Sequence, residues 1–156
     1  MSQEIRSQSE GNSIQASFQQ KSAGVSLFIV GSSALYYFTQ VWPMHAFALA
    51  GTPIPDGYAG LVLTTLGLIV IAEIVLQIVL VIGAGSAAKP TVREKESALK
   101  AMRNAYAVSL VGVLTIVGLQ FVGFSAFSLA NLAMMSLLLA EITRFASQLS
   151  YSRQAA

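Results

Sequence analysis

The sequence predicts an all-α fold: an integral membrane bundle of four transmembrane helices, with an amphipathic cytosolic extension before the third span. Two observations predict this class. Hydrophobic residues make up 54% of the 156 residues and charged residues only 10%, whereas an average soluble domain has roughly 25% charged residues. Four apolar stretches are also long enough to cross a hydrocarbon core of about 30 Å, which takes about 20 helical residues.

The four predicted spans cover residues 22–42, 58–84, 104–124 and 125–143. They make up a transmembrane domain at 22–146, between a polar N-terminal tail at 1–21 and a short C-terminal tail at 147–156. The third and fourth spans are almost contiguous, which predicts a tight helical hairpin with Gly123 and Ser125 in its turn.

The basic residues lie on one side of these spans. All nine Lys and Arg residues are in the two tails, between the second and third spans, or directly after the fourth span. None is in the 43–57 loop or the 123–125 turn, so the positive-inside rule predicts cytoplasmic N and C termini. The outer interface is expected to collect the aromatic residues Tyr36, Tyr37, Trp42, Tyr58 and Phe124. The 43–57 loop, with three prolines around an apolar centre, predicts a short interfacial helix followed by a turn.

A glycine-rich sequence ends the second predicted span. GAGSAA at 83–88 matches the G-x-G-x-x-A pattern of dinucleotide-binding turns. That turn needs a strand before it and a helix after it, whereas the apolar run here starts near residue 60, and Lys89 and Pro90 follow at once. We therefore interpret the glycines as the end of a membrane helix at the cytosolic interface.

Glu73 lies inside the second span, roughly 20 Å and 24 Å from its two ends at 1.5 Å per residue. A charge at that depth costs several kcal/mol, so the side chain must be protonated, hydrogen-bonded in the bundle or exposed to a wet cavity. Gln77, one turn later, and Thr65, two turns earlier, complete a candidate intramembrane polar site. The site is either a proton or cation relay or a buried hydrogen bond that fixes helix packing. The second interpretation is favoured because no second carboxylate lies at this depth.

Other polar residues in the spans predict structural contacts. Glu141 and Arg144 are a candidate ion pair near the inner headgroups, where the i, i+3 spacing makes pairing easy. Three single amides are expected to join hydrogen bonds between helices: Asn104, Gln120 and Asn131.

The inventory of reactive side chains is small. The chain has no cysteine and a single histidine, His45, which excludes thiolate zinc sites, Fe–S clusters and multi-histidine metal sites. His45 and Asp56 share the outer loop, but no nucleophile, metal ligand or oxyanion donor stands beside them. We therefore expect no metal, no cofactor and no enzymatic activity. The net charge of +2 is too small to indicate direct binding of nucleic acid.

The segment before the third span has the pattern of an amphipathic cytosolic helix. Thr91 and Glu94 fit a capping box that starts a helix directly after Pro90. Val92, Leu99 and Met102 share one helical stripe with Tyr106. The candidate partner-facing residues are Val92, Arg93, Lys95, Leu99, Lys100, Met102 and Arg103.

These patterns favour one function and leave two alternatives open. We expect a non-catalytic membrane protein that contacts the lipid bilayer and binds another protein through its cytosolic face, as a regulatory partner or as an accessory subunit of a membrane complex. The first alternative is a small proton-coupled transporter that uses Glu73. The second is lipid or quinone binding between helices, for which the sequence offers no discriminating feature.

Two tripeptides recur in spans that are predicted to run in the same direction through the membrane. VSL occurs at 25–27 and 108–110, and AEI at 72–74 and 140–142. The recurrence has two interpretations: a parallel repeat of two helical hairpins, as in some transporters, or chance matches between apolar segments.

Parts of the chain resemble a known family. The likeness lies in IAEIVLQIVL, in the charged linker that leads to KAMRNAYAVSLVGV, and in NLAMMSLLLAEITRFASQLSYSR, with RNAY at 103–106 and the run at 140–153 as its most specific parts. Over residues 70–153 the chain resembles a family of small four-helix inner-membrane proteins of unknown function, common in bacteria and also found in archaea. Relatives usually have an Asp-Glu-Arg-Asp type motif in the linker, where this chain has VREKES.

The resemblance implies a multi-pass protein of the bacterial inner (cytoplasmic) membrane. Members are often encoded beside a small helix-turn-helix regulator, which implies a membrane partner that sequesters a soluble protein. No catalytic residues come with the family.

Overall fold

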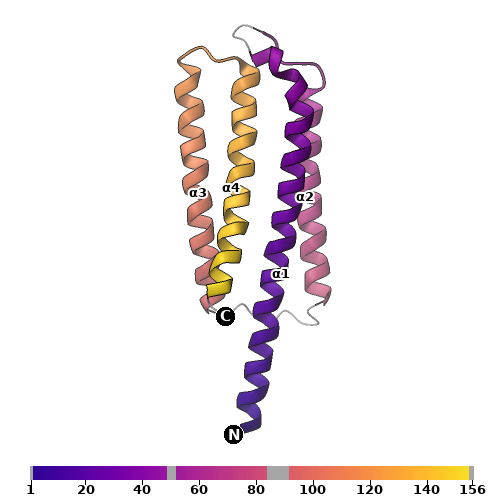
Figure 1. Ribbon diagram of the computed structural model, residues 1–156, viewed down its shortest axis with the longest axis vertical. Helices are drawn as coiled ribbons and strands as arrows, with labels where there is room; N and C mark the ends of the chain where they lie inside the picture. The colour runs from indigo at the N-terminus through magenta and orange to yellow at the C-terminus, as the bar shows by residue number, and fades with distance from the viewer. Residues whose placement is uncertain (1, 49–51, 84–91, 155–156) are drawn as a thin grey trace.

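The computed structural model describes residues 2–48, 52–83 and 92–154 of the chain. Four long helices and one short 3₁₀ helix follow each other in the order α1 (Ser2–Val41), η1 (Trp42–Ala48), α2 (Tyr58–Gly83), α3 (Val92–Gln120) and α4 (Ala126–Gln154). Both termini lie at one end of the bundle, which we call the terminal end (Figure 1). The opposite end, formed by η1, residues 52–57 and residues 121–125, is the loop end. All four long helices are long and apolar enough to cross a membrane, which confirms the predicted helical class.

The four helices stand side by side in the order α3, α4, α1, α2 (Figure 1). Among the described residues, the extensive interfaces between long helices are α3 with α4, α1 with α4, and α1 with α2. The helices α2 and α3 therefore form the two edges, and each has its extensive interface with one neighbour. Their outward faces carry large exposed apolar side chains, which include Leu63, Ile71, Ile78, Val111 and Leu114.

The buried core lies between α1, α2 and α4. Its members larger than alanine are apolar or aromatic. They are Val30 and Tyr37 of α1, Tyr58 of α2, and Phe127, Met134, Leu138 and Phe145 of α4. The helix α3 instead packs on α4 through small residues, because Ala101 and Ala105 are buried and Gly112 lies directly against Ser136. A Cβ atom added at Gly112 would overlap the Ser136 side chain. Small residues of this kind let two helix backbones approach closely.

The turn between α3 and α4 confirms the predicted hairpin. Gly123 has a φ of +82°, a left-handed conformation that glycine adopts without strain. Ser125 is the N-cap of α4, since its Oγ accepts a hydrogen bond from the Ser128 backbone N–H at 3.1 Å. The Ser125 hydroxyl also lies 3.3 Å from the Phe47 carbonyl oxygen and so ties η1 to the start of α4. The predicted short helix in the 43–57 loop is this η1, and Gly57 makes the turn before α2 with a φ of +81°.

Three helices extend beyond the predicted spans. The helix α1 begins at Ser2 rather than near residue 22, α3 begins at Val92, and α4 continues to Gln154. Apolarity sets how much of a helix can lie in lipid, but hydrogen bonding within the backbone continues wherever the residues tolerate it. The predicted polar tails are therefore largely extensions of α1 and α4. The predicted N-cap Thr91 lies outside the described residues, directly before the start of α3.

The glycine-rich stretch follows a helix. The helix α2 runs without interruption from Tyr58 to Gly83, so no strand precedes GAGSAA among the described residues. A dinucleotide-binding turn needs a strand before it, so the helix agrees with the rejection of a nucleotide-binding site at GAGSAA. Residues 84–88 themselves lie outside the described part of the chain.

Candidate functional site

Glu73 of α2 meets Ser26 of α1 in the middle part of the bundle. The Ser26 hydroxyl donates a hydrogen bond to Oε2 of Glu73 at 3.1 Å, and Ser26 is almost fully buried. The second carboxyl oxygen, Oε1, is also buried, and no hydrogen-bond partner reaches it. Ser26 lies in the recurring tripeptide VSL at 25–27, and Glu73 lies in the recurring tripeptide AEI at 72–74. Among the buried side-chain N and O atoms of the described residues, this oxygen is the one without a partner, and such an atom costs on the order of 1–3 kcal/mol.

The two residues predicted to accompany Glu73 do not join this contact. Thr65 is fully buried, and its hydroxyl donates to the carbonyl oxygen of Leu61 on its own helix at 2.9 Å. Gln77 is exposed. The structure therefore assembles a serine–glutamate pair between two helices rather than a continuous polar face along α2.

A second polar cluster joins three helices closer to the loop end. The hydroxyl groups of Tyr37 and Tyr58 lie 2.7 Å apart, and Tyr37 donates to Oδ1 of Asn131 at 2.6 Å. Tyr58 lies 3.2 Å from the same oxygen. The side-chain amide of Asn131 donates to the Phe127 carbonyl at 3.0 Å, which orients Oδ1 toward the tyrosines. We call these three residues the tyrosine–asparagine cluster.

Two phenolic protons serve the three short contacts of this cluster. The two shortest contacts give a consistent assignment in which Tyr58 donates to Tyr37 and Tyr37 donates to Asn131. Each hydroxyl then donates one hydrogen bond, and the carbonyl oxygen of Asn131 is an acceptor only. Because the groups satisfy one another, neither phenolic hydroxyl has a free proton to donate to a ligand. It fixes the relative positions of α1, α2 and α4.

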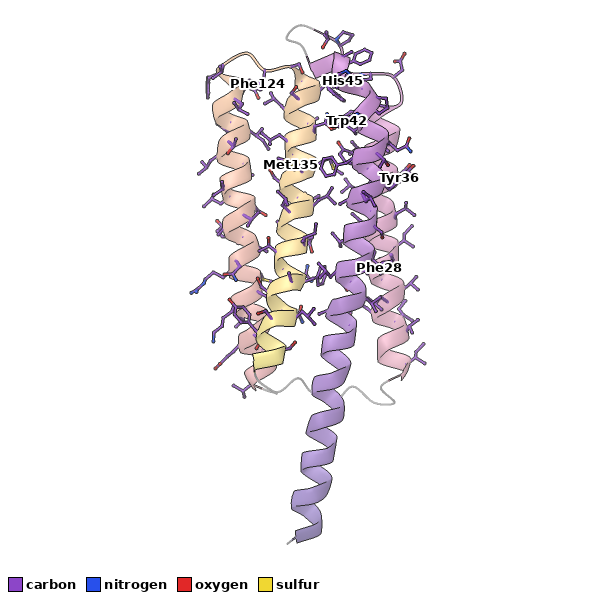
Figure 2. All side chains as sticks on the ribbon, in the orientation of Figure 1. Phe28, Tyr36, Trp42, His45, Phe124 and Met135 are labelled. Atoms are coloured by element: carbon purple, nitrogen blue, oxygen red, sulfur yellow. The ribbon has the colours of Figure 1, made fainter. Side chains whose placement is uncertain are left out.

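The five aromatic residues predicted at the outer interface differ in burial. Tyr37 is fully buried and Tyr58 is 3% exposed, so both face neighbouring helices rather than outward. Tyr36, Trp42 and Phe124 are exposed, and Trp42 and Phe124 lie near the loop end in Figure 2. The sequence does contain a signal for the cluster, since a tyrosine buried in lipid needs a polar partner and Asn131 is one of the few amides in the spans.

Polar side chains also join α3 and α4 near the terminal end. The Asn104 amide donates to the Tyr151 hydroxyl at 3.0 Å and to Ser147 Oγ at 3.3 Å, and Asn131 bonds across helices as well, which confirms two of the three predicted amides. Gln120 is exposed. Glu141 and Arg144 form the predicted ion pair at 3.0 Å on partly exposed side chains.

The start of α3 presents a continuous surface away from α4. Ala101 and Ala105 face α4, whereas Val92, Leu99 and Met102 are exposed together with Tyr106. The predicted basic residues on this segment, Lys95, Lys100 and Arg103, are exposed as well, while the side chain of Arg93 lies outside the described part of the structure. We call the surface of Val92, Leu99, Met102 and Tyr106 the α3 stripe.

An apolar groove of about 530 Å³ runs between α2 and α4 from the loop end. Its floor is formed by Tyr58, Val62, Ala130 and Met134, and its sides by Ile54, Ala59, Leu63, Ala133 and Leu137. Tyr58 contacts Phe127 and Asn131 of α4 directly, and beside these contacts small side chains at facing positions leave the groove open. The facing positions Ala59, Ala130 and Ala133 carry only methyl groups.

Within the described ranges, no three His, Asp or Glu side chains come close enough to hold a metal ion. Comparison with protein-family models, with curated proteins and with solved structures finds no match to this chain.

Proposed function

We propose that the chain is a multi-pass protein of the bacterial inner membrane that binds a protein partner through its cytosolic face and has no catalytic role. It would act as a regulatory partner or as an accessory subunit of a membrane complex. Two observations support the membrane setting. The edge helices α2 and α3 expose apolar side chains along their length, as lipid-facing helices do. All nine Lys and Arg residues lie outside the loop end, which favours a cytosolic terminal end.

The α3 stripe is the observation that carries the partner proposal. Counting about 20 residues back from Gln120, the end of α3 at the loop end, places the inner limit of the hydrocarbon near Ala101. Val92 therefore lies more than two helical turns beyond this limit and Leu99 lies at it, yet their side chains are 74% and 66% exposed. Lipid tails would not reach Val92 in this setting. An exposed apolar stripe that continues beyond the hydrocarbon is typical of a surface that another protein covers.

The helix that carries the stripe is held in a fixed position. Asn104 bonds to Ser147 and Tyr151 of α4, and Ala101 and Ala105 pack against the same helix. The first turns of α3 therefore continue its span beside the end of α4 (Figure 1). A preformed helix face binds a partner at a smaller entropic cost than a disordered segment does.

The charged residues beside the α3 stripe indicate the sign of the charge that the partner's surface would carry. Lys95, Lys100 and Arg103 are exposed beside it, and the exposed Glu96 is the acidic residue of that segment whose side chain is described. A complementary partner would present an apolar patch with acidic side chains at its rim.

Site-specific photo-crosslinking in living cells tests this proposal. A benzophenone amino acid placed at Leu99 or Met102 should give a discrete protein adduct, whereas the same group at Leu114, an exposed position of α3 within the span, should label lipid only. Changing Lys95 and Lys100 to Glu should lower the yield of the adduct at Leu99. Absence of a protein adduct at Leu99, or equal adducts at Leu99 and Leu114, would refute the proposal.

One observation favours a second candidate, a proton-coupled transporter. Oε1 of Glu73 is buried and lacks a partner, so it could exchange a proton or meet a cation when the helices move. The pair with Ser26 has no further polar neighbour in Thr65 or Gln77, which favours a packing role. Proton flux into proteoliposomes that falls in Glu73→Gln but not in the control Glu141→Gln would support transport. Equal flux in the wild type and in Glu73→Gln would exclude it.

A further inference from the structure

We propose that the groove between α2 and α4 binds one acyl chain of an ethanolamine phospholipid from the leaflet at the loop end. The inference rests on the membrane setting proposed above but not on the cytosolic partner. It concerns the opposite end of the bundle and a different pair of helices.

The chemistry of the groove indicates an apolar chain. Apart from the Tyr58 hydroxyl, the lining side chains present hydrocarbon or, at Met134, a thioether. The polar atom nearest to the floor is the Tyr58 hydroxyl, which is engaged with Tyr37 and Asn131. A quinone head would need hydrogen-bond donors for its carbonyl oxygens, and the floor has none to spare. A volume of about 530 Å³ is within the usual range for a small-ligand pocket.

The position of the groove matches one leaflet. It begins at Ile54 and Tyr58, at the loop end, and reaches Leu137, which is about 17 Å along α4 from Ala126 at 1.5 Å per residue. Half of a hydrocarbon core of about 30 Å is about 15 Å. A lipid whose head lies at the loop end can therefore place one chain along the full length of the groove. The groove is open along its side, so a lipid can enter from the bilayer.

The charge at the mouth of the groove selects the headgroup. Asp56 is exposed in the turn between Ile54 and Tyr58, and this turn is closed by a 3.2 Å hydrogen bond from the Tyr58 backbone N–H to the Pro55 carbonyl. No Lys or Arg occurs anywhere between residues 22 and 88 or between 104 and 143. His45, the other titratable group of the loop, is held at 3.0 Å from the Trp42 carbonyl oxygen. The mouth therefore attracts a primary ammonium group and repels an anionic headgroup.

Native mass spectrometry of the full chain tests the proposal. The protein is reconstituted in vesicles of equal parts dioleoyl phosphatidylethanolamine and dioleoyl phosphatidylglycerol, extracted in mild detergent, and examined for retained lipid. We expect one retained lipid, with ethanolamine favoured about fivefold over glycerol, the preference that one favourable contact of a surface charge gives. Asp56→Asn should remove the preference, and Asp56→Lys should reverse it.

Two variants fill the groove from facing walls, namely Ala133→Phe of α4 and Ala59→Phe of α2. Both should lose the retained lipid, while Ala146→Phe, an exposed alanine near the other end of α4, should keep it. Thermal unfolding shows which variants are folded, and a loss of lipid in either folded groove variant is sufficient support. Three results would overturn the proposal: equal lipid retention in the wild type and both folded groove variants, equal retention of the two headgroups by the wild type, or a dimer that the groove variants dissociate. None of them affects the crosslink at Leu99.

Discussion

The tyrosine–asparagine cluster gives the sharpest prediction, the effect of Tyr37→Phe on stability. The Tyr37 hydroxyl takes part in two hydrogen bonds, at 2.7 Å with Tyr58 and at 2.6 Å with Asn131. A hydrogen bond between membrane helices contributes about 0.6 kcal/mol on average and up to about 1.7 kcal/mol. Tyr58 retains a weaker contact with Asn131 at 3.2 Å and recovers part of the loss. We therefore expect Tyr37→Phe to lower the free energy of unfolding by about 1–2 kcal/mol.

The neighbouring residue supplies a matched control. Tyr36 is exposed, so Tyr36→Phe makes the same chemical change one position away and should alter stability by less than about 0.5 kcal/mol. Tyr58→Phe should cost less than Tyr37→Phe, because Tyr37 keeps its 2.6 Å bond to Asn131. The two changes should be non-additive, since they remove one shared hydrogen bond.

Equilibrium unfolding in mixed micelles of a mild detergent and dodecyl sulfate, followed by circular dichroism, measures these free energies. The single tryptophan, Trp42, gives an independent fluorescence signal at the loop end. If Tyr37→Phe costs no more than Tyr36→Phe, or if Tyr58→Phe costs more than Tyr37→Phe, the assigned direction of the hydrogen bonds is incorrect.

Two further predictions concern helix packing and capping. Gly112→Ala should destabilise the protein by about 1–3 kcal/mol because the new methyl group overlaps Ser136, whereas Gly118→Ala on the same helix meets open space and should be neutral or stabilising by up to about 1 kcal/mol; thermal unfolding in detergent compares the two, and equal effects would argue against the close contact. Ser125→Ala should cost about 1 kcal/mol through loss of the α4 N-cap, and Ser125→Thr should restore most of it in the same assay; a Thr variant as unstable as Ala would show that capping is not the cause.

Hydropathy, turn chemistry and near-neighbour spacing predicted the local features of this chain. The four spans follow from composition and length, and the turn at Gly123 and Ser125 follows from residue types that need no tertiary information. The Glu141–Arg144 pair is equally local, because three residues on a helix already bring the charges together.

The contacts between helices were harder to predict. A span that is apolar on every side gives no contrast between a buried face and a lipid-facing one, so the burial of Tyr37 and the exposure of Tyr36 were not distinguishable. The partner of Glu73 is Ser26, which is 47 residues away in the chain and carries one small hydroxyl. The sequence predicts partners for Glu73 on its own helix, because the spacing of residues along a single helix is the only spacing that a sequence defines. The groove between α2 and α4 depends on the side-by-side order of the helices, which no local pattern specifies.

The way the helices pair has a consequence for biosynthesis. The Ser26–Glu73 and Tyr37–Tyr58 bonds lie within the first hairpin, α1 with α2, so both pairs consist of residues that the ribosome makes before α4. The second hairpin, α3 with α4, packs within itself through Gly112 and Asn104. The α1–α4 interface then joins the two halves, with Asn131 completing the cluster. In the membrane setting proposed above, each half would enter the bilayer as a hairpin with its own internal contacts, and the two hairpins would then dock through the α1–α4 interface.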